Sequence, residues 1–474
     1  MDKSFLFCVA RYWLCSLLSV VGACHHFSPI AYVDDLPSTH RGVWQSDGYG
    51  YLLDLSGKQL AVYDITADVC IYNKLNSRVL SHYINKTAIR FVAGTGRLEF
   101  ATPLDEYAIE LYRRDSLPKR CSDRPSDAAE ASFDAFVSFM RTHYAFFDLY
   151  GVDWERQAAV GRSRLNLDTT QAQLFEILSA MIEPLRDGHL TLSGTIDGQA
   201  AEAKPGVSEV DLAFSRIAGK TQGSSRDLSN KFLKHYWFEE IPETLLKGQG
   251  QLRANKFIQY GVMSDDIGYI AIATTAAYAG RGPFHEREDL QVLHETLDEV
   301  ITLFERSKVK AVVIDLSINF GGYSFPAWEL ASRFAADSFV AYRKQAQDSQ
   351  YQKPHVVVVR PSERQRYLGP VYVLTSDMTV SGGEEMTMAL RALPRTVHMG
   401  EATRGALSDV LEKRLPNGWV LTMSNELYEG PEGQLWEGRG IPPELPLTVF
   451  DRTNPYRGHR EALQRVTEVI DNSH

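Results

Sequence analysis

The sequence predicts an α/β fold built on a mainly parallel sheet with helices on both faces. Two short apolar runs, Ala311 to Leu316 and Val371 to Leu374, have the length and the β-branched content of buried strands. Residues 290–304 place apolar side chains at helical spacing, and a further helix is expected from about Phe325 to Phe334. Strands that are apolar on both faces and alternate with helices require a sheet that is covered on both sides.

Composition and charge narrow the class of protein. The chain has 474 residues, of which 44% are hydrophobic and 23% charged, as is usual for globular chains of two or three domains. A net charge of −10 argues against a nucleic-acid partner. The spacing of Cys and His does not suggest zinc, and we predict neither a metal nor a cofactor.

The first 24 residues have the pattern of an export signal. Lys3 and Arg11 precede an apolar stretch from Tyr12 to Ala23, which is too short to span a membrane. The ending Val-Val-Gly-Ala-Cys resembles a bacterial lipobox, in which Cys24 would carry lipid, although a plain signal peptide has the same general pattern. His25 after this cysteine would direct a lipoprotein to the outer membrane. We therefore expect a protein on the periplasmic face of a bacterial membrane, anchored only through lipid.

The remaining chain divides into segments of different periodicity. After a tether at 25–39, short alternating runs predict a small β-rich domain at 40–122. Cys70 and Cys121 are a candidate disulfide in an oxidising compartment. A helical subdomain is expected at 123–195, where one helical face carries Phe133, Phe136, Val137, Met140, Tyr144 and Phe147. Residues 196–260 are interpreted as a connector with one helix near 227–236, residues 261–450 as the core, and residues 451–474 as a terminal helix.

Ser381 lies where a buried strand is expected to turn into a helix. It occupies the N-cap position of that helix, and Glu384 follows three residues later as in a capping box. Gly382 and Gly383 permit close approach of other backbone, and free N–H groups of a first helical turn point toward an anion. Ser381 is therefore either a nucleophile or only a helix cap.

Two further positions give only weak evidence of a functional role when each is considered alone. His189 follows Asp187-Gly188 at the start of a short strand, and a lone histidine is more often structural than catalytic. Gly321 and Gly322 follow a buried strand, where backbone N–H groups can turn toward a ligand, but the pair could also be only a tight turn.

The order of these pieces along the chain resembles a known family. Five motifs occur in sequence: Asp187-Gly-His-Leu, Ile314-Asp-Leu-x-x-Asn-x-Gly-Gly, Thr379-Val-Ser-Gly-Gly-Glu, Gly400-Glu-x-Thr-Arg-Gly and Trp436-Glu-Gly-x-Gly-Ile-Pro-Pro. Together they resemble the tail-specific, or C-terminal processing, serine peptidases over roughly residues 130–195 and 260–450. The resemblance implies a ClpP/crotonase-like core with an N-terminal helical subdomain beside it.

The same resemblance distinguishes two ways to activate the serine. In the Ser/Lys branch a lysine follows the serine by 25 positions, where this chain has Ala406. The tricorn-like branch uses His and Glu, and His189 and Glu437 stand in the corresponding motifs. Ser381 would then attack a carbonyl carbon, with His189 as the base and Glu437 orienting it. The N–H groups of Gly382 and of Gly321 or Gly322 would hold the oxyanion. Glu384, Glu385 and Glu401 compete with Glu437 for the orienting role.

The expected partner is a peptide or protein substrate. We find no convincing PDZ-like segment to capture the carboxyl terminus of a substrate, so recognition of protein tails is not implied. Three alternatives remain: a silent ligand-binding protein on the same fold, an esterase or amidase with the same triad, and a coenzyme A thioester enzyme. The sequence gives neither the oligomeric state nor the role of the β-rich domain.

Overall fold

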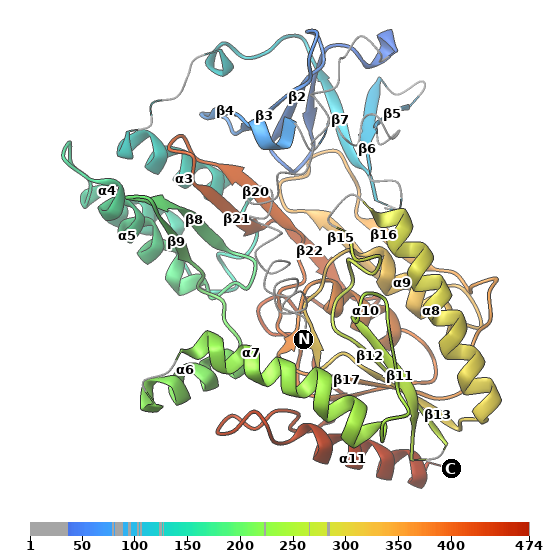
Figure 1. The fold of residues 1–474 in the computed structure, drawn as a ribbon. Coiled ribbons are helices and arrows are strands. Elements are labelled where there is room, and N and C mark those ends of the chain that lie inside the picture. Colours follow the sequence, from blue (N-terminus) through green and yellow to red (C-terminus); the bar gives the residue numbers. More distant parts are fainter. Residues whose placement is uncertain are drawn as a thin grey trace.

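The computed structural model describes residues 37–473, except 78–79, 81–88, 93–95, 102–103, 105–106, 123–125, 127, 222–223, 265 and 282–284 (Figure 1). The expected export signal, Cys24 and most of the tether lie outside the described residues. Among the helices that are described, none has the length and apolarity needed to cross a membrane.

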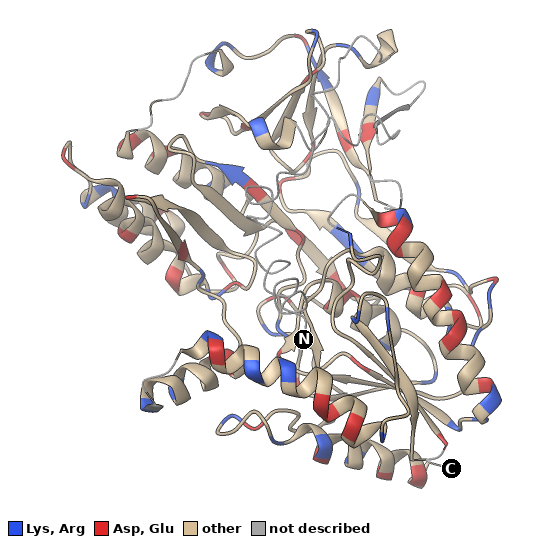
Figure 2. Ribbon diagram, viewed as in Figure 1, with Lys and Arg blue, Asp and Glu red and all other residues tan. Residues whose placement is uncertain are grey.

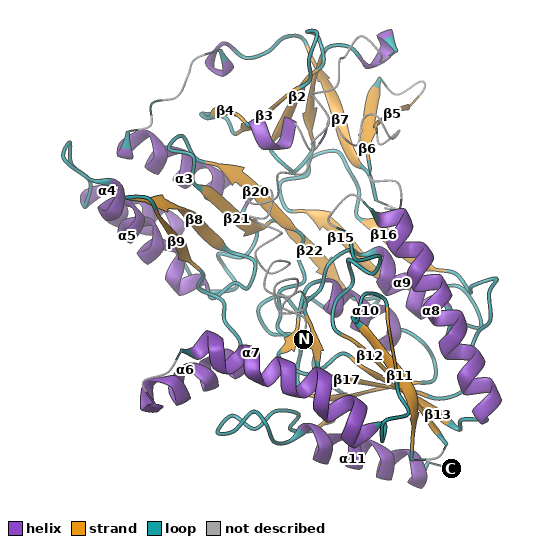
Figure 3. Cartoon of the chain, in the orientation of Figure 1, coloured by secondary structure: helices purple, strands orange, loops and turns teal. Residues whose placement is uncertain are grey.

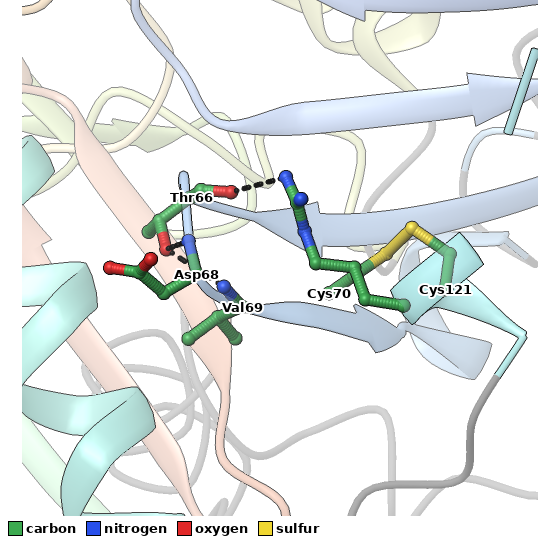
Figure 4. The surroundings of a disulfide bond; sticks show 6 residues. Thr66, Asp68, Val69, Cys70 and Cys121 are labelled. Carbon is green, nitrogen blue, oxygen red and sulfur yellow. Dashed lines mark hydrogen bonds between the residues drawn. A yellow bond between two sulfur atoms is a disulfide. The ribbon is translucent and has the colours of Figure 1, made fainter. Parts of the chain in front are cut away.

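The N-terminal β-rich region is a seven-stranded antiparallel sheet in the order β4-β3-β2-β1-β7-β6-β5. Its strands are β1 (Val43–Ser46), β2 (Tyr51–Asp54), β3 (Ala61–Ile65), β4 (Cys70–Tyr72), β5 (Ile89–Val92), β6 (Arg97–Phe100) and β7 (Ile109–Arg114). Two short 3-10 helices, η2 (Ser38–His40) and η3 (Lys119–Cys121), flank it. A disulfide joins Cys70 in β4 to Cys121, the pair that the sequence suggested (Figure 4). The bond ties the end of this region to the edge of its own sheet.

The helical region consists of α3 (Ala129–His143), α4 (Trp154–Ser163), α5 (Gln171–Ile182) and the 3-10 turn η4 (Glu183–Leu185). The first helix was expected to reach Phe147, but α3 ends at His143, and the backbone of Tyr144 is already extended. Phe147 instead stacks on Trp154 of α4, a helix that the sequence analysis did not anticipate, with ring centroids 5.0 Å apart. These helices share a core with Leu411 and Leu421 from the C-terminal part of the chain, so the region is not an independent unit.

The segment 196–260, interpreted as a connector, contains the helix expected near 227–236 and several further elements. It contains β9 (Gln199–Ala203), α6 (Glu209–Thr221), α7 (Ser225–His235), the π-helix η5 (Tyr236–Leu245), β10 (Gln251–Arg253) and the start of β11 (Ile258–Met263). Apolar residues of α6, α7 and η5, including Phe214, Phe232 and Trp237, are buried in the main core. The sequence analysis expected one helix here, whereas the structure has two α-helices and a π-helix, each with an apolar face in the core.

The main core contains a second seven-stranded sheet, in the order β10-β11-β12-β13-β17-β19-β23. Strands β12 (Ile267–Ile272), β13 (Ala311–Asp315), β17 (Val371–Thr375), β19 (Thr396–Gly400) and β23 (Leu445–Pro446) run parallel, as expected, whereas β10 and β11 are antiparallel additions. Every residue of β12, β13 and β17 is buried.

Helices supply the cover that these strands require. They are α8 (Glu286–Ser307), α9 (Phe325–Ser332), α10 (Gly382–Arg391) and α11 (His459–Asn472). In Figure 3, α8 lies to the right of the core strands, α9 lies above them, α7 runs from their left to below them, and α11 lies below them. Figure 2 shows that acidic and basic residues are mixed along α8 and α11, while the strands between them carry few charges.

Three small sheets complete the architecture. They are the parallel pair β14 (Ile318–Asn319) and β18 (Met378–Thr379), the antiparallel group of β15 (Phe339–Ala346), β16 (His355–Val359) and β22 (Glu426–Glu429), and the four strands β20 (Val410–Arg414), β21 (Val420–Ser424), β8 (Thr191–Ile196) and β9. The pair β14 and β18 matters most for the site, since its register aligns Asn319 with Thr379. Two residues further on, the same alignment brings Gly321 beside Ser381.

Buried polar contacts fix the N-terminal sheet to the core. The Asp47 carboxylate accepts hydrogen bonds from the backbone N–H groups of residues 350, 351 and 352 and from the Ser349 hydroxyl. Lys413 of β20 donates to the carbonyl oxygens of Tyr49 and Gly50 at 2.7 and 2.9 Å, and its ammonium lies 3.4 Å from the Asp64 carboxylate. The N-terminal sheet is therefore part of one body with the core.

Candidate active site

Ser381 stands at a strained corner between β18 and α10. Its backbone has φ +57° and ψ −124°, a conformation that is unfavourable for a residue with a side chain. The corner is held because the Ser381 N–H lies 3.1 Å from both the Ala406 carbonyl oxygen and the Glu384 carboxylate. Strain of this kind is retained where the surrounding structure over-determines the position, and it is common at reactive residues.

Two free backbone N–H groups lie beside Ser381. The Gly322 N–H and the Gly382 N–H have no acceptor among the described residues. A Cβ placed on Gly382 would come within 3.2 Å of the Gly322 nitrogen, so the two donors are neighbours. Gly322 has φ +142°, a conformation that favours glycine. The pair forms a cradle for a negatively charged oxygen.

Gly321 does not contribute such a donor, and here the structure corrects the sequence analysis. Its N–H donates to the Asn319 side-chain oxygen at 2.9 Å. Its role is spatial, because an added Cβ would meet the Ser381 Cβ at 2.7 Å and the Gly382 nitrogen at 2.9 Å. Only a residue without a side chain allows this loop to lie against the serine.

His189 is held at the start of β8 by its backbone. Its N–H donates to Asp187 at 2.7 Å, and its carbonyl oxygen accepts from the Thr422 hydroxyl at 2.8 Å. The ring nitrogen Nδ1 is buried and has no hydrogen-bond partner among the described residues. Burial lowers the pKa of His189, the Lys204 charge lowers it further, and the charges of Asp187 and Asp409 raise it. The net lowering favours the neutral imidazole, which is the form that can accept a proton.

Glu437 and Asp187 are two buried carboxyl groups near this histidine. Glu437 accepts from the N–H groups of Leu407 and Ser408 at 2.9 and 3.0 Å through one oxygen, while its other oxygen has no partner among the described residues. One oxygen of Asp187 is likewise without a partner. Burial and the charge of Asp187 raise the pKa of Glu437 well above its usual range. No hydrogen bond joins Glu437 to His189 within the described part of the chain.

The segment from Arg404 to Ser408 connects all three predicted triad residues. The Ala406 carbonyl oxygen binds Ser381, and the N–H groups of Leu407 and Ser408 bind Glu437. A Cβ on Gly188, next to His189, would lie 2.9 Å from the Ala406 Cβ. The three positions, far apart in sequence, therefore meet around one short loop.

The competing carboxyl groups have structural partners. Glu384 accepts from Thr403, Gly405 and Ala406 in addition to Ser381, so it braces the loop rather than a histidine. Glu385 accepts from the hydroxyls of Ser324 and Tyr342, and burial raises its pKa to about 7. A salt bridge of 2.9 Å joins Glu401 to Arg452.

Tyr144 and Tyr150 are neighbours of the site that the sequence analysis had assigned no role. Burial and the charge of Asp187 raise the pKa of both hydroxyls, which therefore stay protonated. The Glu437 charge acts on both; the Tyr144 hydroxyl faces the Asp187 carboxyl group, whereas the Tyr150 hydroxyl has no hydrogen-bond partner among the described residues. An aromatic residue in a helical stripe carries no sequence signal that would separate this placement from ordinary core packing.

A cavity of about 340 Å³ lies between the N-terminal sheet and the core. Its walls include Tyr49 and Tyr107 from the N-terminal region and Ser324, Trp328 and Asp409 from the core. Ser324 follows the Gly321-Gly322 loop, and Asp409 follows the loop that binds Glu437. Within the described ranges, no group of three or more His, Cys, Asp and Glu side chains could hold a metal ion.

Comparison with known proteins gives one family match and several similar folds. Residues 266–447 match the model of peptidase family S41. The fold is similar to a peptidase-like protein from Parabacteroides merdae, at 20% identity over 72% of this chain and 96% of that chain, with a TM-score of 0.56. Mature CPAF is 12% identical over 73% of this chain and 98% of its own, with a TM-score of 0.51. The structural likenesses establish the fold, and the family match supports a serine-type peptidase, a hydrolase.

The tricorn protease is also a structural neighbour, but a distant one. It is 13% identical over 89% of this chain and 44% of that chain, with a TM-score of 0.38. A similarity of this size carries no argument about the way in which the serine is activated.

Proposed function

We propose that this chain is an exported serine peptidase that hydrolyses peptide bonds through an acyl-enzyme, with Ser381, His189 and Glu437 as its triad. The observation that carries the proposal is the strained Ser381 corner, which lies against two N–H donors that have no acceptor among the described residues. A serine that only capped its helix would need neither feature. The Ser/His/Glu assignment follows the tricorn-like branch on a ClpP/crotonase-like core.

The chemistry proceeds in two stages. As the Ser381 oxygen bonds to the carbonyl carbon, its proton passes to His189, and the N–H groups of Gly322 and Gly382 receive the oxyanion. The C–N bond then breaks as His189 returns the proton to the leaving amine. In the second stage water donates its proton to His189, attacks the acyl carbon and releases the carboxylic acid, and Ser381 recovers its proton.

Glu437 orients His189 and stabilises its charged form once the imidazole has taken the proton. In the resting site the raised pKa of Glu437 reflects burial and its carboxylate neighbours. A positive imidazolium close by would favour the ionised carboxylate. Proton transfer to His189 and ionisation of Glu437 are thus expected to support each other.

The substrate, in this proposal, is a peptide that places one side chain in the cavity between the N-terminal sheet and the core. The loops that carry the oxyanion donors and bind Glu437 continue directly into the wall of that cavity. Export rests on the N-terminal signal pattern, and attachment to the periplasmic face of an outer membrane rests on Cys24 and His25.

Labelling with a fluorophosphonate tests the proposal. Wild-type protein is expected to label, Ser381→Ala and His189→Ala to lose labelling, and Glu437→Ala to label more slowly. Ser163→Ala, which alters an exposed serine at the end of α4, is the matched control. Failure of the folded wild-type protein to label would contradict the proposal and favour the ligand-binding alternative.

Substrate turnover separates the remaining alternatives. A peptidase cleaves an internally quenched peptide, whereas an esterase hydrolyses a simple ester of the same acyl group and leaves the peptide intact. Ester hydrolysis without peptide cleavage would overturn the assignment as a peptidase while retaining the triad.

A further inference from the structure

Thr275 presents a buried hydroxyl group at the site, and no step of the proposed mechanism uses it. The residue follows β12 and has no exposed surface. Its Oγ1 atom has no hydrogen-bond partner among the described residues. A buried hydroxyl without a partner costs free energy, so its retention calls for an explanation.

The position of this hydroxyl is set by the backbone on both sides of the oxyanion loop. The Thr275 N–H donates to the Gly321 carbonyl oxygen at 2.8 Å, and the Thr275 carbonyl oxygen accepts from the Tyr323 N–H at 3.2 Å. Thr275 and Gly322 thus face each other in a parallel bridge. The side chain is held against the loop by these contacts and cannot move away from it without breaking them.

The hydroxyl lies against both glycines that supply the free N–H groups. A Cβ placed on Gly382 would come within 2.5 Å of Thr275 Oγ1, and one placed on Gly322 would come within 2.9 Å. Absence of a side chain at these two positions is what makes room for the hydroxyl. The other polar atoms near the position of that Gly382 Cβ are the Gly322 nitrogen and the Tyr323 carbonyl oxygen, both at 3.2 Å, and the Thr275 hydroxyl makes no hydrogen bond to a described residue.

We infer that the Thr275 hydroxyl is a third donor of the oxyanion hole, beside the N–H groups of Gly322 and Gly382. Three donors that make no hydrogen bond to a described residue are incomplete until an oxygen enters. The substrate carbonyl oxygen becomes negative as the Ser381 oxygen bonds to its carbon, and it then accepts all three hydrogen bonds. A hydroxyl that can rotate about its C–O bond follows this oxygen as the carbonyl carbon becomes tetrahedral. The inference rests on the proposed peptidase function and adds a catalytic residue to it.

The neighbouring Thr274 provides a matched control. It is also buried, but its hydroxyl donates to the Gly321 carbonyl oxygen at 2.7 Å. Thr274→Val therefore removes a hydrogen bond that the folded protein already makes, and it should lower the free energy of unfolding. Thr275→Val has the same change in shape but removes a hydroxyl without a partner, so it should leave stability equal or higher.

The kinetic test uses Thr275→Val and Thr275→Ser with an internally quenched peptide. Thr275→Val is expected to lower kcat by about 10²-fold with little change in KM, because the lost bond forms only in the transition state. Thr275→Ser, which restores the hydroxyl, should recover most of the activity. A peptide boronic acid, whose tetrahedral adduct resembles the transition state, should lose affinity for Thr275→Val by a similar factor.

Two results would overturn the inference. One is a kcat for Thr275→Val within about twofold of wild type, and the other is a loss of kcat that serine does not restore and that accompanies a loss of stability. Failure of the wild-type protein both to label with fluorophosphonate and to cleave peptide would instead refute the proposed function, and this inference with it. The two failures are therefore distinguishable.

Discussion

Two buried clusters of ionisable residues in this molecule differ in how many of their polar atoms have hydrogen-bond partners. The interface cluster, Asp64 and Lys413, joins the N-terminal sheet to the core. Its carboxylate accepts from Asn73, from Lys413 and from the Arg414 N–H, and its ammonium donates to two carbonyl oxygens. The proposed catalytic cluster, Asp187, His189 and Glu437, has one polar atom on each residue without a partner among the described residues.

The difference suggests a division between residues that stabilise the fold and residues that act in the proposed reaction. A satisfied network in a low-dielectric interior fixes two elements in one geometry, and breaking it leaves a buried charge. A cluster with unused hydrogen-bonding capacity contributes less to folding but can respond to a proton or to a substrate. We therefore expect changes in the interface cluster to act on stability and changes in the catalytic cluster to act on rate.

The largest expected effect is that of His189→Ala on activity. Without its base the enzyme should lose about 10⁴- to 10⁶-fold in kcat, as is typical when one member of a triad is removed. The free energy of unfolding should fall by only about 1 kcal/mol, because the ring nitrogen Nδ1 has no partner to lose and the ring makes one hydrogen bond, with the Ser408 backbone. Single-turnover kinetics and urea denaturation measure the two quantities. A large loss of stability with a small loss of rate would reverse the comparison.

Lys413→Met should have the opposite profile. Removing the ammonium leaves Asp64 buried and unpaired, which typically costs about 3–5 kcal/mol of unfolding free energy. The kcat per folded molecule should be unchanged. The double variant Asp64→Asn with Lys413→Met should be more stable than Lys413→Met alone, as urea denaturation would show. If the double variant is less stable than the single one, the partnership of these two residues is refuted.

Loss of the disulfide should destabilise the N-terminal sheet more than the core. Cys70 and Cys121 are 51 residues apart, and removing a bond that closes a loop of this length typically costs about 2–4 kcal/mol. Thermal unfolding of Cys70→Ser with Cys121→Ser, beside wild type with and without reductant, measures the loss. Equal melting temperatures in all three samples would contradict the expectation.

The smallest expected effects are opposite shifts in the pH profile of kcat/KM. Burial lowers the pKa of His189, so the acid limb should lie below the ordinary histidine value of about 6.5. Lys204→Met removes a positive charge that lowers this pKa, so the limb should move to higher pH. Asp187→Asn removes a negative charge that raises the pKa, so the limb should move to lower pH. Shifts in the same direction would contradict this electrostatic account.

Much of the core could be predicted from the sequence because its strands are uniformly apolar and its motifs are local. The strand from Val371 to Leu374 and the turn at Ser381 can be recognised from the sequence, since strand, corner and helix are adjacent in the chain. The helix at 225–235 was predicted to within two residues, whereas the helix at 209–221 was missed although Val210 and Phe214 are buried in the core. The helical stripe was extended beyond His143 because periodicity does not show where a backbone leaves the helix.

Only those residues of the site that belong to a sequence motif could be predicted. Gly321 and Gly322 are alike in the sequence, and only the fold shows that Asn319 takes the N–H of Gly321. Thr275 and Lys204 belong to no motif and enter the site through tertiary packing. Asp187 was visible only as part of the Asp-Gly-His motif, since its interaction with Glu437 depends on segments about 250 residues apart.

The most direct test of the central claim is to locate the fluorophosphonate adduct by mass spectrometry after proteolysis of the labelled protein. The account predicts one dominant adduct, on Ser381, which is absent from folded Ser381→Ala and His189→Ala and unchanged in Ser163→Ala. An adduct on another residue, or labelling of Ser381 that persists undiminished in His189→Ala, would show that this histidine does not activate the serine.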